Sequence, residues 1–240
     1  HFKEDLTMSF IRSVSAARAP RHDLYAGIHK GMRAFMCETL RRLGCMDPDD
    51  DVELAETLDG VSLLLDFCRG HLEHENAVIH PALEAHRTGA AQQASEDHVD
   101  HETSLAIISA QIAQVRESSG CTRTRAALRL YRLLAIFVGE NFLHMHMEET
   151  DHNEALWLAC SDAELIELEH RIHAMIQPAE MALALRWMIP AMTPAERLAV
   201  MGPLREAVPP AVFESLLDDV RPHLDARALV KLESGLRRAA

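Results

Sequence analysis

The chain is 240 residues long, with 48% hydrophobic residues, 25% charged residues and a net charge of −13, a composition typical of a globular protein with one main core. Aromatic residues make up only 5% of the chain and glycines number ten, which favours helices over sheets. The negative charge and the scattered arginines argue against a nucleic-acid surface. Because no apolar run is long enough for a membrane span or a signal peptide, we expect a cytoplasmic protein with no membrane partner.

The five cysteines do not form a pattern that binds metal or builds disulfides. Their number is odd, and no two of them form a Cys-x-x-Cys pair. We therefore expect reduced thiols that pack as small hydrophobic side chains.

Four long helices are expected after a tail at residues 1–20. Apolar residues recur at helical spacing through residues 23–43, 52–76, 91–117 and 122–151, and glycine, proline and acidic turn residues separate these segments. Each helix would be about 30 to 45 Å long at 1.5 Å per residue. Long helices joined by short loops predict an all-α protein with an up-and-down four-helix bundle.

The last quarter of the chain differs in character from the rest. A capping box that begins at Ser161 predicts a further helix, and with it the bundle domain is expected to span residues 21–177. Prolines then punctuate short helices through residues 178–240, with Thr193 and Pro194 at the start of one of them. We expect this stretch to be a helical C-terminal extension that packs on the bundle, on a protein partner or on a second copy of the chain.

Histidine occurs fifteen times, and its placement points to metal binding. Each of the four long helices carries a histidine on its apolar stripe, and two of these histidines precede a glutamate by four residues. The residues are His29, His71 with Glu75, His98 or His101, and His144 with Glu148. Positions i and i+4 of a helix project side by side, so each pair presents an imidazole and a carboxylate to one small volume. Such ligands suit a pair of iron ions, or manganese.

Spacing alone does not identify the ligands. A single buried histidine is most often a hydrogen-bonded core residue, but four on four consecutive helices would be costly to bury without a shared partner. The same spacing also occurs at His80 with Glu84 and at His98 with Glu102. His80 lies nine residues after His71, which places it on the opposite face of a continuous helix, so we expect it at the surface.

Two segments resemble the signature of the hemerythrin-like, HHE cation-binding domain family. Residues 67–83 contain His-x-x-x-Glu followed by Pro-Ala-Leu, residues 142–149 contain a second His-x-x-x-Glu, and the likeness extends from about residue 22 to residue 173. The resemblance implies a four-helix bundle with two iron ions, oxo- or hydroxo-bridged, for which manganese or zinc could substitute. It also implies that the histidines are terminal ligands and that Glu75 and Glu148 bridge the two ions.

The third helix departs from the pattern of the oxygen-carrying hemerythrins, which have a His-x-x-x-His pair there. Here the residues four after His98 and His101 are Glu102 and Leu105. Seven ligands would thus become six, as in the iron-repair and sensor branches of the family. In the carriers the last carboxylate also follows its histidine by five residues, which leaves Glu149 as an alternative to the glutamate at the i+4 position.

The expected function is to bind or sense a small diatomic molecule or oxidant, such as oxygen, nitric oxide or peroxide, or to handle iron, rather than to act as a dedicated enzyme. Tyr25, one turn before His29, would line the ligand pocket or place its hydroxyl at the end of the bundle. One alternative is a ferritin-like di-iron oxidase, whose Glu-x-x-His pattern begins at Glu149 and Glu167, only 18 residues apart. The other is a metal-free helical interaction module that docks through its C-terminal helices.

Overall fold

The computed structural model describes residues 21–238, and these residues form helices joined by turns, with no strand. The prediction of an all-α protein is therefore confirmed for this part of the chain. The predicted tail at residues 1–20 lies outside the described residues. Among residues 21–238, no helix combines the length and the hydrophobicity that crossing a bilayer requires.

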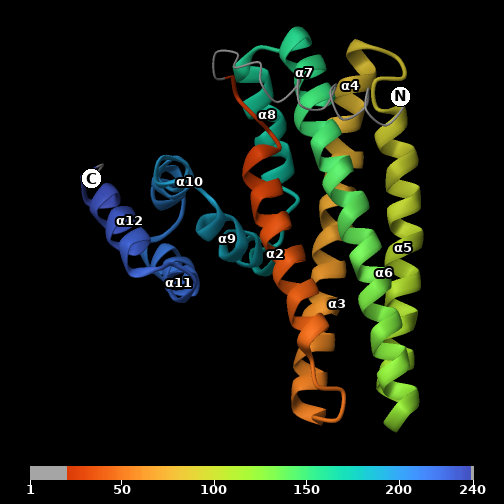
Figure 1. The fold of residues 1–240 in the computed structure, drawn as a ribbon. Helices are drawn as coiled ribbons and strands as arrows, with labels where there is room; N and C mark the ends of the chain where they lie inside the picture. The colour runs from red at the N-terminus through yellow and green to blue at the C-terminus, as the bar shows by residue number, and fades with distance from the viewer. Residues whose placement is uncertain (1–20, 239–240) are drawn as a thin grey trace, which may run out of the picture.

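The four longest helices lie side by side and enclose the largest hydrophobic core (Figure 1). They are α2 (Ala26–Cys45), α3 (Asp51–His74), α5 (Gln92–Glu117) and α6 (Gly120–Met147). Both α2 and α5 contact α3 and α6, so the four helices close a ring around the core. Residues that the periodicity places on their inner stripes are buried, among them Met36, Leu64, Leu105 and Leu130.

Aspartate side chains accept hydrogen bonds from backbone N–H groups at the starts of the first two of these helices. The Asp23 carboxylate accepts hydrogen bonds from the backbone N–H groups of Tyr25 at 2.9 Å and Ala26 at 3.0 Å. At the start of α3, the Asp50 carboxylate accepts one from the N–H of Val52 at 3.0 Å. Such caps satisfy N–H groups that have no partner inside the helix, and the first of them holds Tyr25 at the start of α2.

Two of the long helices continue beyond their predicted ends, each through a wider turn. α3 passes into a π-helical turn at Glu75–Ile79 and then into α4 (His80–His86), and α6 passes into a second π turn at Glu148–His152 and then into α7 (Asn153–Ala159). The N–H that follows each turn donates to the carbonyl of the glutamate that opens it, five residues earlier. A π turn holds an extra residue, so the helix beyond it is rotated relative to a continuous α-helix.

Three helices gather over one end of the four long ones (Figure 1). They are α4, α7 and α8 (Asp162–His173), and α8 begins with the predicted capping box between Ser161 and Glu164. A second hydrophobic cluster forms beneath them and includes Tyr25, Ile79, Leu83, Leu156 and Leu165. This cluster closes the end of the molecule at which the two π turns lie.

The C-terminal part of the described chain forms helices around a core of its own. They are α9 (Pro178–Ala191), α10 (Pro194–Ala207), α11 (Pro210–Val220), a 3-10 turn (Arg221–His223) and α12 (Ala226–Arg238). The first three begin with a proline at the first helical position, as its fixed backbone angle favours. The core includes Leu185, Ile189, Met201, Phe213, Leu217 and Leu232.

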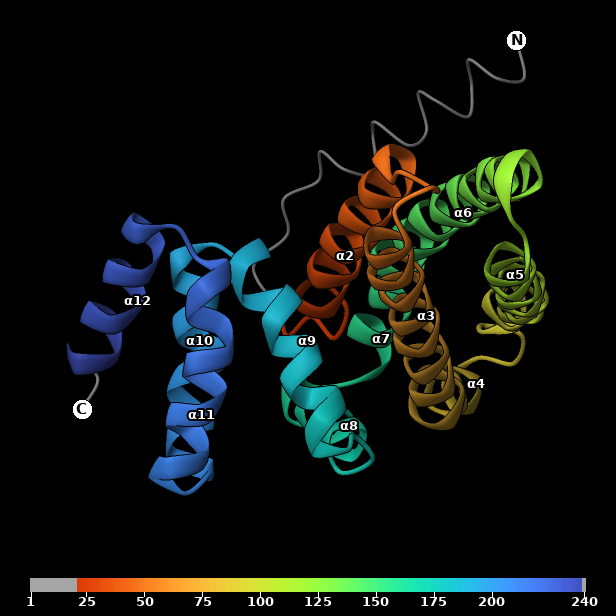
Figure 2. The ribbon, with the colours of Figure 1, turned by 90° about the horizontal axis from the view of Figure 1, so that it is seen from below.

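These C-terminal helices contact the rest of the protein chiefly where α9 packs against α2 (Figure 2). The indole of Trp187 stacks on the ring of Phe35, with centroids 4.3 Å apart and planes 11° from parallel. Lys30 of α2 also donates to the carboxylate of Glu196 in α10 at 2.6 Å. The extension therefore lies against the helix that carries His29.

The close approach of α9 to Gly31 predicts that even one methyl group will weaken this contact. A Cβ atom at Gly31 would lie 2.8 Å from Cγ and 3.0 Å from the backbone N of Met188. Gly60→Ala in α3 is the matched control, because a Cβ there meets nothing within 4 Å and gains the same helix propensity. We expect the free energy of unfolding of Gly31→Ala to be about 1 to 3 kcal/mol below that of Gly60→Ala in chemical denaturation. Equal stabilities would contradict the close packing.

Candidate metal centre

Four helices and the two π turns bring imidazoles and carboxylates together at the closed end of the molecule. The contributors are His29 of α2, His71 of α3, Glu75 of the first π turn, His98 of α5, His144 of α6 and Glu148 of the second π turn. We call these six residues the central cluster. Its side chains are at most 5% exposed, except His71 at 11%, so the polar groups face one another rather than water.

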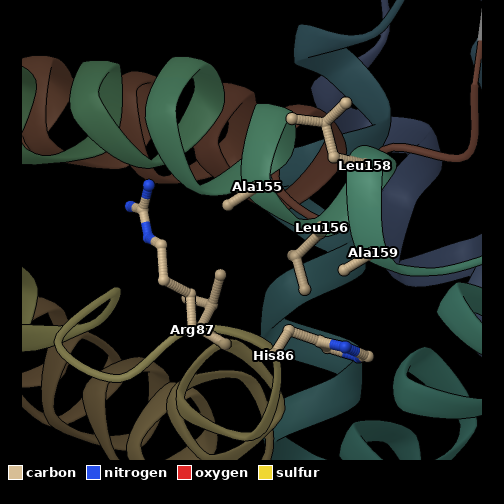
Figure 3. A pocket seen from close by; sticks show the side chains of 7 residues that line it. His86, Arg87, Ala155, Leu156, Leu158 and Ala159 are labelled. Carbon is tan, nitrogen blue, oxygen red and sulfur yellow. The ribbon is translucent and has the colours of Figure 1, made fainter.

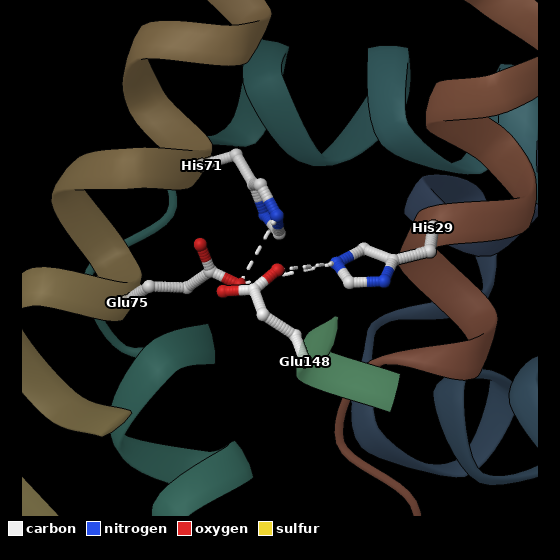
Figure 4. Close-up of side chains that lie close together, drawn as sticks. All are labelled: His29, His71, Glu75 and Glu148. Carbon is white, nitrogen blue, oxygen red and sulfur yellow. Dashed lines mark ion pairs between the residues drawn. The ribbon is translucent and has the colours of Figure 1, made fainter. Parts of the chain in front are cut away.

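Glu75 divides its two carboxylate oxygens between two groups of histidines. Its Oε1 lies 3.2 Å from Nε2 of His71 and 3.9 Å from Nε2 of His29 (Figure 4). Its Oε2 lies 3.5 Å from Nε2 of His98 on the other side. One carboxylate therefore faces two separate sets of nitrogen atoms.

Glu148 divides its oxygens in the same way. Its Oε2 lies 3.5 Å from Nε2 of His29. Its Oε1 lies 3.3 Å from Nε2 of His144 and 4.0 Å from Nε2 of His98. The central cluster thus contains two positions, one between the carboxylates and His29 with His71, the other between the carboxylates and His98 with His144, and the candidate ligand atoms at each lie within 4.8 Å of one another.

Most of the inward atoms of the central cluster lack a hydrogen bond. They include both oxygens of Glu75, both oxygens of Glu148, and Nε2 of His29 and of His71. Burying so many polar atoms without partners is costly. Ligand nitrogens about 2.1 Å from one ion and at right angles are about 3.0 Å apart, and the Nε2 atoms of His98 and His144 are 3.0 Å apart. The unpaired atoms and their spacing therefore fit metal ions.

Three of the histidines are oriented by hydrogen bonds on their outer nitrogen. Nδ1 of His29 lies 3.1 Å from Oε1 of Glu149, Nδ1 of His98 lies 2.9 Å from Oδ1 of Asn76, and Nδ1 of His144 lies 3.2 Å from Oδ2 of Asp97. When Nδ1 donates to such an acceptor, Nε2 is directed inward and its lone pair is strengthened as a ligand.

Charge is distributed unevenly among the histidines of the central cluster. Burial alone would lower the pKa of His29, but Glu149, Glu75 and Glu148 raise it to about 9. In the same way the carboxylate of Glu148 outweighs burial and raises the pKa of His144 to about 9. Burial lowers the pKa of His98 to about 3. Without metal, the His144 cation therefore donates a hydrogen bond to neutral His98.

The two buried carboxyl groups respond differently to their surroundings. Burial on its own would raise the pKa of both carboxyl groups. At Glu75 the neighbouring histidines His71 and His29 outweigh burial and hold the pKa well below the usual value. At Glu148 the charge of Glu75 adds to burial, and the pKa of Glu148 is raised.

The structure places the alternatives that the sequence left open in different surroundings. His98 lies in the central cluster. The ring of His101 packs edge-on against His144 at 4.9 Å and against Phe137 at 5.8 Å, but His101 is in none of the groups of candidate ligand atoms, and its Nδ1 has no hydrogen-bond partner. Glu148 points inward, whereas Glu149 points to the side of α2 and forms an ion pair with Arg33 at 2.5 Å. His98 and Glu148 are therefore the residues placed to share a ligand.

Tyr25 lies beside the central cluster rather than at a wetted end of the molecule. Its side chain is 1% exposed, and its ring centroid is 5.3 Å from that of His29. The hydroxyl is hydrogen-bonded to Nδ1 of His152 at 3.1 Å. Burial and the charges of Glu148 and Glu75 raise the pKa of Tyr25, so the phenol stays protonated near neutral pH.

The expectation that His80 lies at the surface is wrong. Its side chain is only 6% exposed, and its ring stacks on that of His98 with centroids 4.8 Å apart. The π turn between His71 and His80 inserts an extra residue and rotates His80 back toward the inner face.

His152 was not expected in the site either, yet it is 2% exposed and meets His80 edge-on at 5.9 Å. Candidate ligand atoms of His80, Glu148 and His152 lie within 4.8 Å of one another. Burial lowers the pKa of His80, and it lowers that of His152 to about 4, so both imidazoles are neutral. The sequence did hold a signal, because the motifs that end at Glu75 and Glu148 are each followed by another histidine five or four residues after the glutamate.

A surface pocket lies between α4 and α7, outside the central cluster (Figure 3). It is lined by Leu83, His86, Arg87, Ala155, Leu156, Leu158 and Ala159.

The thiol of Cys160 lies near this pocket, with its Sγ 3.3 Å from Nε2 of His86. Burial raises the pKa of the Cys160 thiol, so the thiol stays protonated and is a poor nucleophile. All five cysteines are free, but only Cys68 and Cys160 are buried, so the expectation that the thiols pack as small hydrophobic side chains is wrong for Cys37, Cys45 and Cys121.

Comparison with known proteins adds no assignment: no family model matches the chain, and neither a curated protein nor a solved structure matches it. The resemblance to the hemerythrin-like family stays a prediction that rests on the two His-x-x-x-Glu segments. The arrangement of side chains in the central cluster therefore carries the functional argument.

Proposed function

We propose that the chain is a hemerythrin-like four-helix bundle protein that holds two iron ions in the central cluster. The observation that carries the proposal is the division of oxygens, since each buried carboxylate aims one oxygen at each of two pairs of histidines. His29 with His71 would bind one ion, and His98 with His144 would bind the other. Glu75 and Glu148 would then bridge the ions, as carboxylates do in di-iron proteins built from helices.

The donor set favours iron, with manganese or zinc as substitutes. Imidazole nitrogens are borderline ligands and carboxylate oxygens are hard ones, and the central cluster offers no thiolate. When bound, such a pair of ions, oxo- or hydroxo-bridged, supplies an open coordination position for a small diatomic molecule or an oxidant.

The protein's own contribution is to orient the ligands and exclude water. His29 and Glu148 are 0% exposed and Glu75 is 2% exposed, so only a small molecule such as oxygen, nitric oxide or peroxide fits beside them. The raised pKa of Tyr25 keeps a neutral hydroxyl next to the centre. This enclosure supports binding, sensing or iron handling rather than catalysis on an organic substrate.

The two alternatives have less support. A ferritin-like oxidase would use Glu167 with His170, but these side chains are 70% and 65% exposed on α8. A metal-free interaction module would leave the unpaired buried atoms of the central cluster without a role. That module nevertheless remains the outcome to expect if the purified protein holds no metal.

The hydrogen bond between Asn76 and His98 predicts an effect from outside the central cluster. Asn76 is exposed, and removing its side chain leaves Nδ1 of His98 without the acceptor at 2.9 Å. We expect Asn76→Ala to weaken zinc or cobalt affinity about 10- to 100-fold in competition with a chelator. Glu73→Ala, an exposed neighbour on α3, is the control and should bind as the wild type does. Equal affinities in the two variants would argue against His98 as a ligand.

Binding of a small molecule is tested by optical spectroscopy. The protein is purified from iron-supplemented cells, oxidised in air and exposed to azide or nitric oxide. We expect a near-ultraviolet band that changes on addition of either ligand, because the proposed centre has an open position. A spectrum that shows bound iron but does not respond to either ligand would contradict a binding or sensing role.

A further inference from the structure

His80 and His152 extend the central cluster toward the end of the molecule that α4 and α7 cover. Each is the histidine that follows a π turn's glutamate, and each is at least nine-tenths buried. Their rings meet edge-on with centroids 5.9 Å apart. Neither is needed for the two iron positions proposed above, which already have two histidines each.

The outer nitrogen of each of these histidines is held by a hydroxyl group. Nδ1 of His80 is hydrogen-bonded to Oγ of Ser95 at 3.2 Å, and Nδ1 of His152 is hydrogen-bonded to the hydroxyl of Tyr25 at 3.1 Å. A hydroxyl group can accept a hydrogen bond from an Nδ1–H group as well as donate one to a bare Nδ1. In the tautomer with the proton on Nδ1, both Nε2 lone pairs are free for another ligand.

The buried polar atoms between His80, His152 and Glu148 include several that lack a hydrogen-bond partner. Nε2 of His80 has no hydrogen bond, and neither oxygen of Glu148 has one. One nitrogen from His80, one from His152 and one oxygen from Glu148 all lie within 4.8 Å of one another. Two imidazoles and one carboxylate are a known ligand set for a single ferrous or zinc ion with open positions.

From this geometry we infer that His80, His152 and Glu148 form a third metal position beside the proposed pair. The inference rests on the proposed function, because Glu148 belongs to both sites. A third ion binds more weakly than the first two, since it has three protein ligands and shares Glu148 with its neighbours. The protein therefore takes up two ions tightly and a third only when free metal is in excess.

The third position is tested by counting ions. Metal-free full-length protein is titrated with cobalt(II), and the bound ions are counted by native mass spectrometry while the visible cobalt bands are recorded. We expect the wild type to saturate at three ions and His80→Gln/His152→Gln at two, with the bands of the weakest step missing. The glutamine side chains can still form hydrogen bonds with the hydroxyl groups of Ser95 and Tyr25. His170→Gln alters an exposed histidine and should retain three ions.

Each outcome has a separate meaning. Saturation of the wild type at two ions, or retention of three by His80→Gln/His152→Gln, overturns the third position and leaves the proposed pair intact. A wild type that binds no cobalt overturns both. If the double variant fails to fold by circular dichroism, the single variants His80→Gln and His152→Gln serve instead, and each should lose the third ion.

Discussion

Replacing Glu148 with alanine is expected to abolish tight binding of both metal ions. Its Oε2 faces His29 and its Oε1 faces His144, so one truncation removes a ligand from each position. A remaining ion would also lie beside Glu75 alone, with no second carboxylate to balance its charge. Iron content after purification from supplemented cells, measured by mass spectrometry, gives the result directly.

Two further variants distinguish loss of a ligand from loss of the fold. Glu148→Gln keeps the volume of the side chain but not its charge, and it should also lose metal while circular dichroism shows an intact helical protein. Glu167→Ala alters an exposed carboxylate and should retain metal.

His71→Ala is expected to lose metal as well, because Nε2 of His71 lies 3.2 Å from Oε1 of Glu75. Two ions retained by both Glu148→Ala and His71→Ala would refute the assignment.

Metal affinity is expected to rise steeply with pH and to level off near pH 9. In the metal-free protein, carboxylates outweigh burial and raise the pKa of His29 and of His144 to about 9. A metal ion binds only the neutral imidazole, and His29 and His144 belong to different ions, so below pH 9 each ion displaces one proton. One displaced proton weakens the binding of an ion by about 10-fold for each pH unit lowered. Chelator competition with zinc should therefore show an affinity for each ion about 100-fold lower at pH 6 than at pH 8.

A variant of Glu149 tests the origin of this slope. The hydrogen bond that His29 donates to Glu149 is the largest of the influences that raise the pKa of His29. Glu149→Gln should therefore flatten the pH dependence of the ion bound by His29 and leave that of the ion bound by His144, whereas Glu167→Ala should leave both unchanged. Calorimetry in two buffers of different ionisation enthalpy counts the released protons independently. Affinities that agree at pH 6 and pH 8 would show that neither histidine holds a proton before metal binds.

Hydrophobic periodicity was sufficient to predict which side chains face inward. His29, Glu75, His144 and Glu148 sit on stripes that continue into buried apolar residues such as Leu64. The stripe of an α-helix is set by its 3.6-residue repeat, which is visible in the sequence. The inward positions of the metal-ligand candidates were therefore predictable wherever the helix stays regular.

The same periodicity misled where the helix is irregular. Counting nine residues from His71 placed His80 outside, because the count assumed an uninterrupted α-helix. The π turn at Glu75–Ile79 adds a residue and turns His80 inward. No residue type marks a π turn in the way that glycine or proline marks a break, so these turns could not be read from the sequence.

The choice between His98 and His101 also required the structure. Both are 3% exposed, and a separation of three residues puts both on one face of a helix. Both rings pack against that of His144, and only the packing against α6 decides that Nε2 of His98 is hydrogen-bonded to Nε2 of His144 at 3.0 Å. Residue type and spacing predict which face of a helix a side chain occupies. Which side chain of the neighbouring helix it contacts depends on how the two helices are rotated against each other, which the sequence does not show.

Iron content per chain is the measurement that tests the central claim most directly. The protein is purified from iron-supplemented cells, and bound metal is quantified by mass spectrometry alongside the optical spectrum. We expect two irons per chain and a near-ultraviolet band, because Glu75 and Glu148 present one oxygen to each of two pairs of histidines. Protein that holds no metal, or one loosely bound zinc ion, would contradict the di-iron centre and favour the helical interaction module.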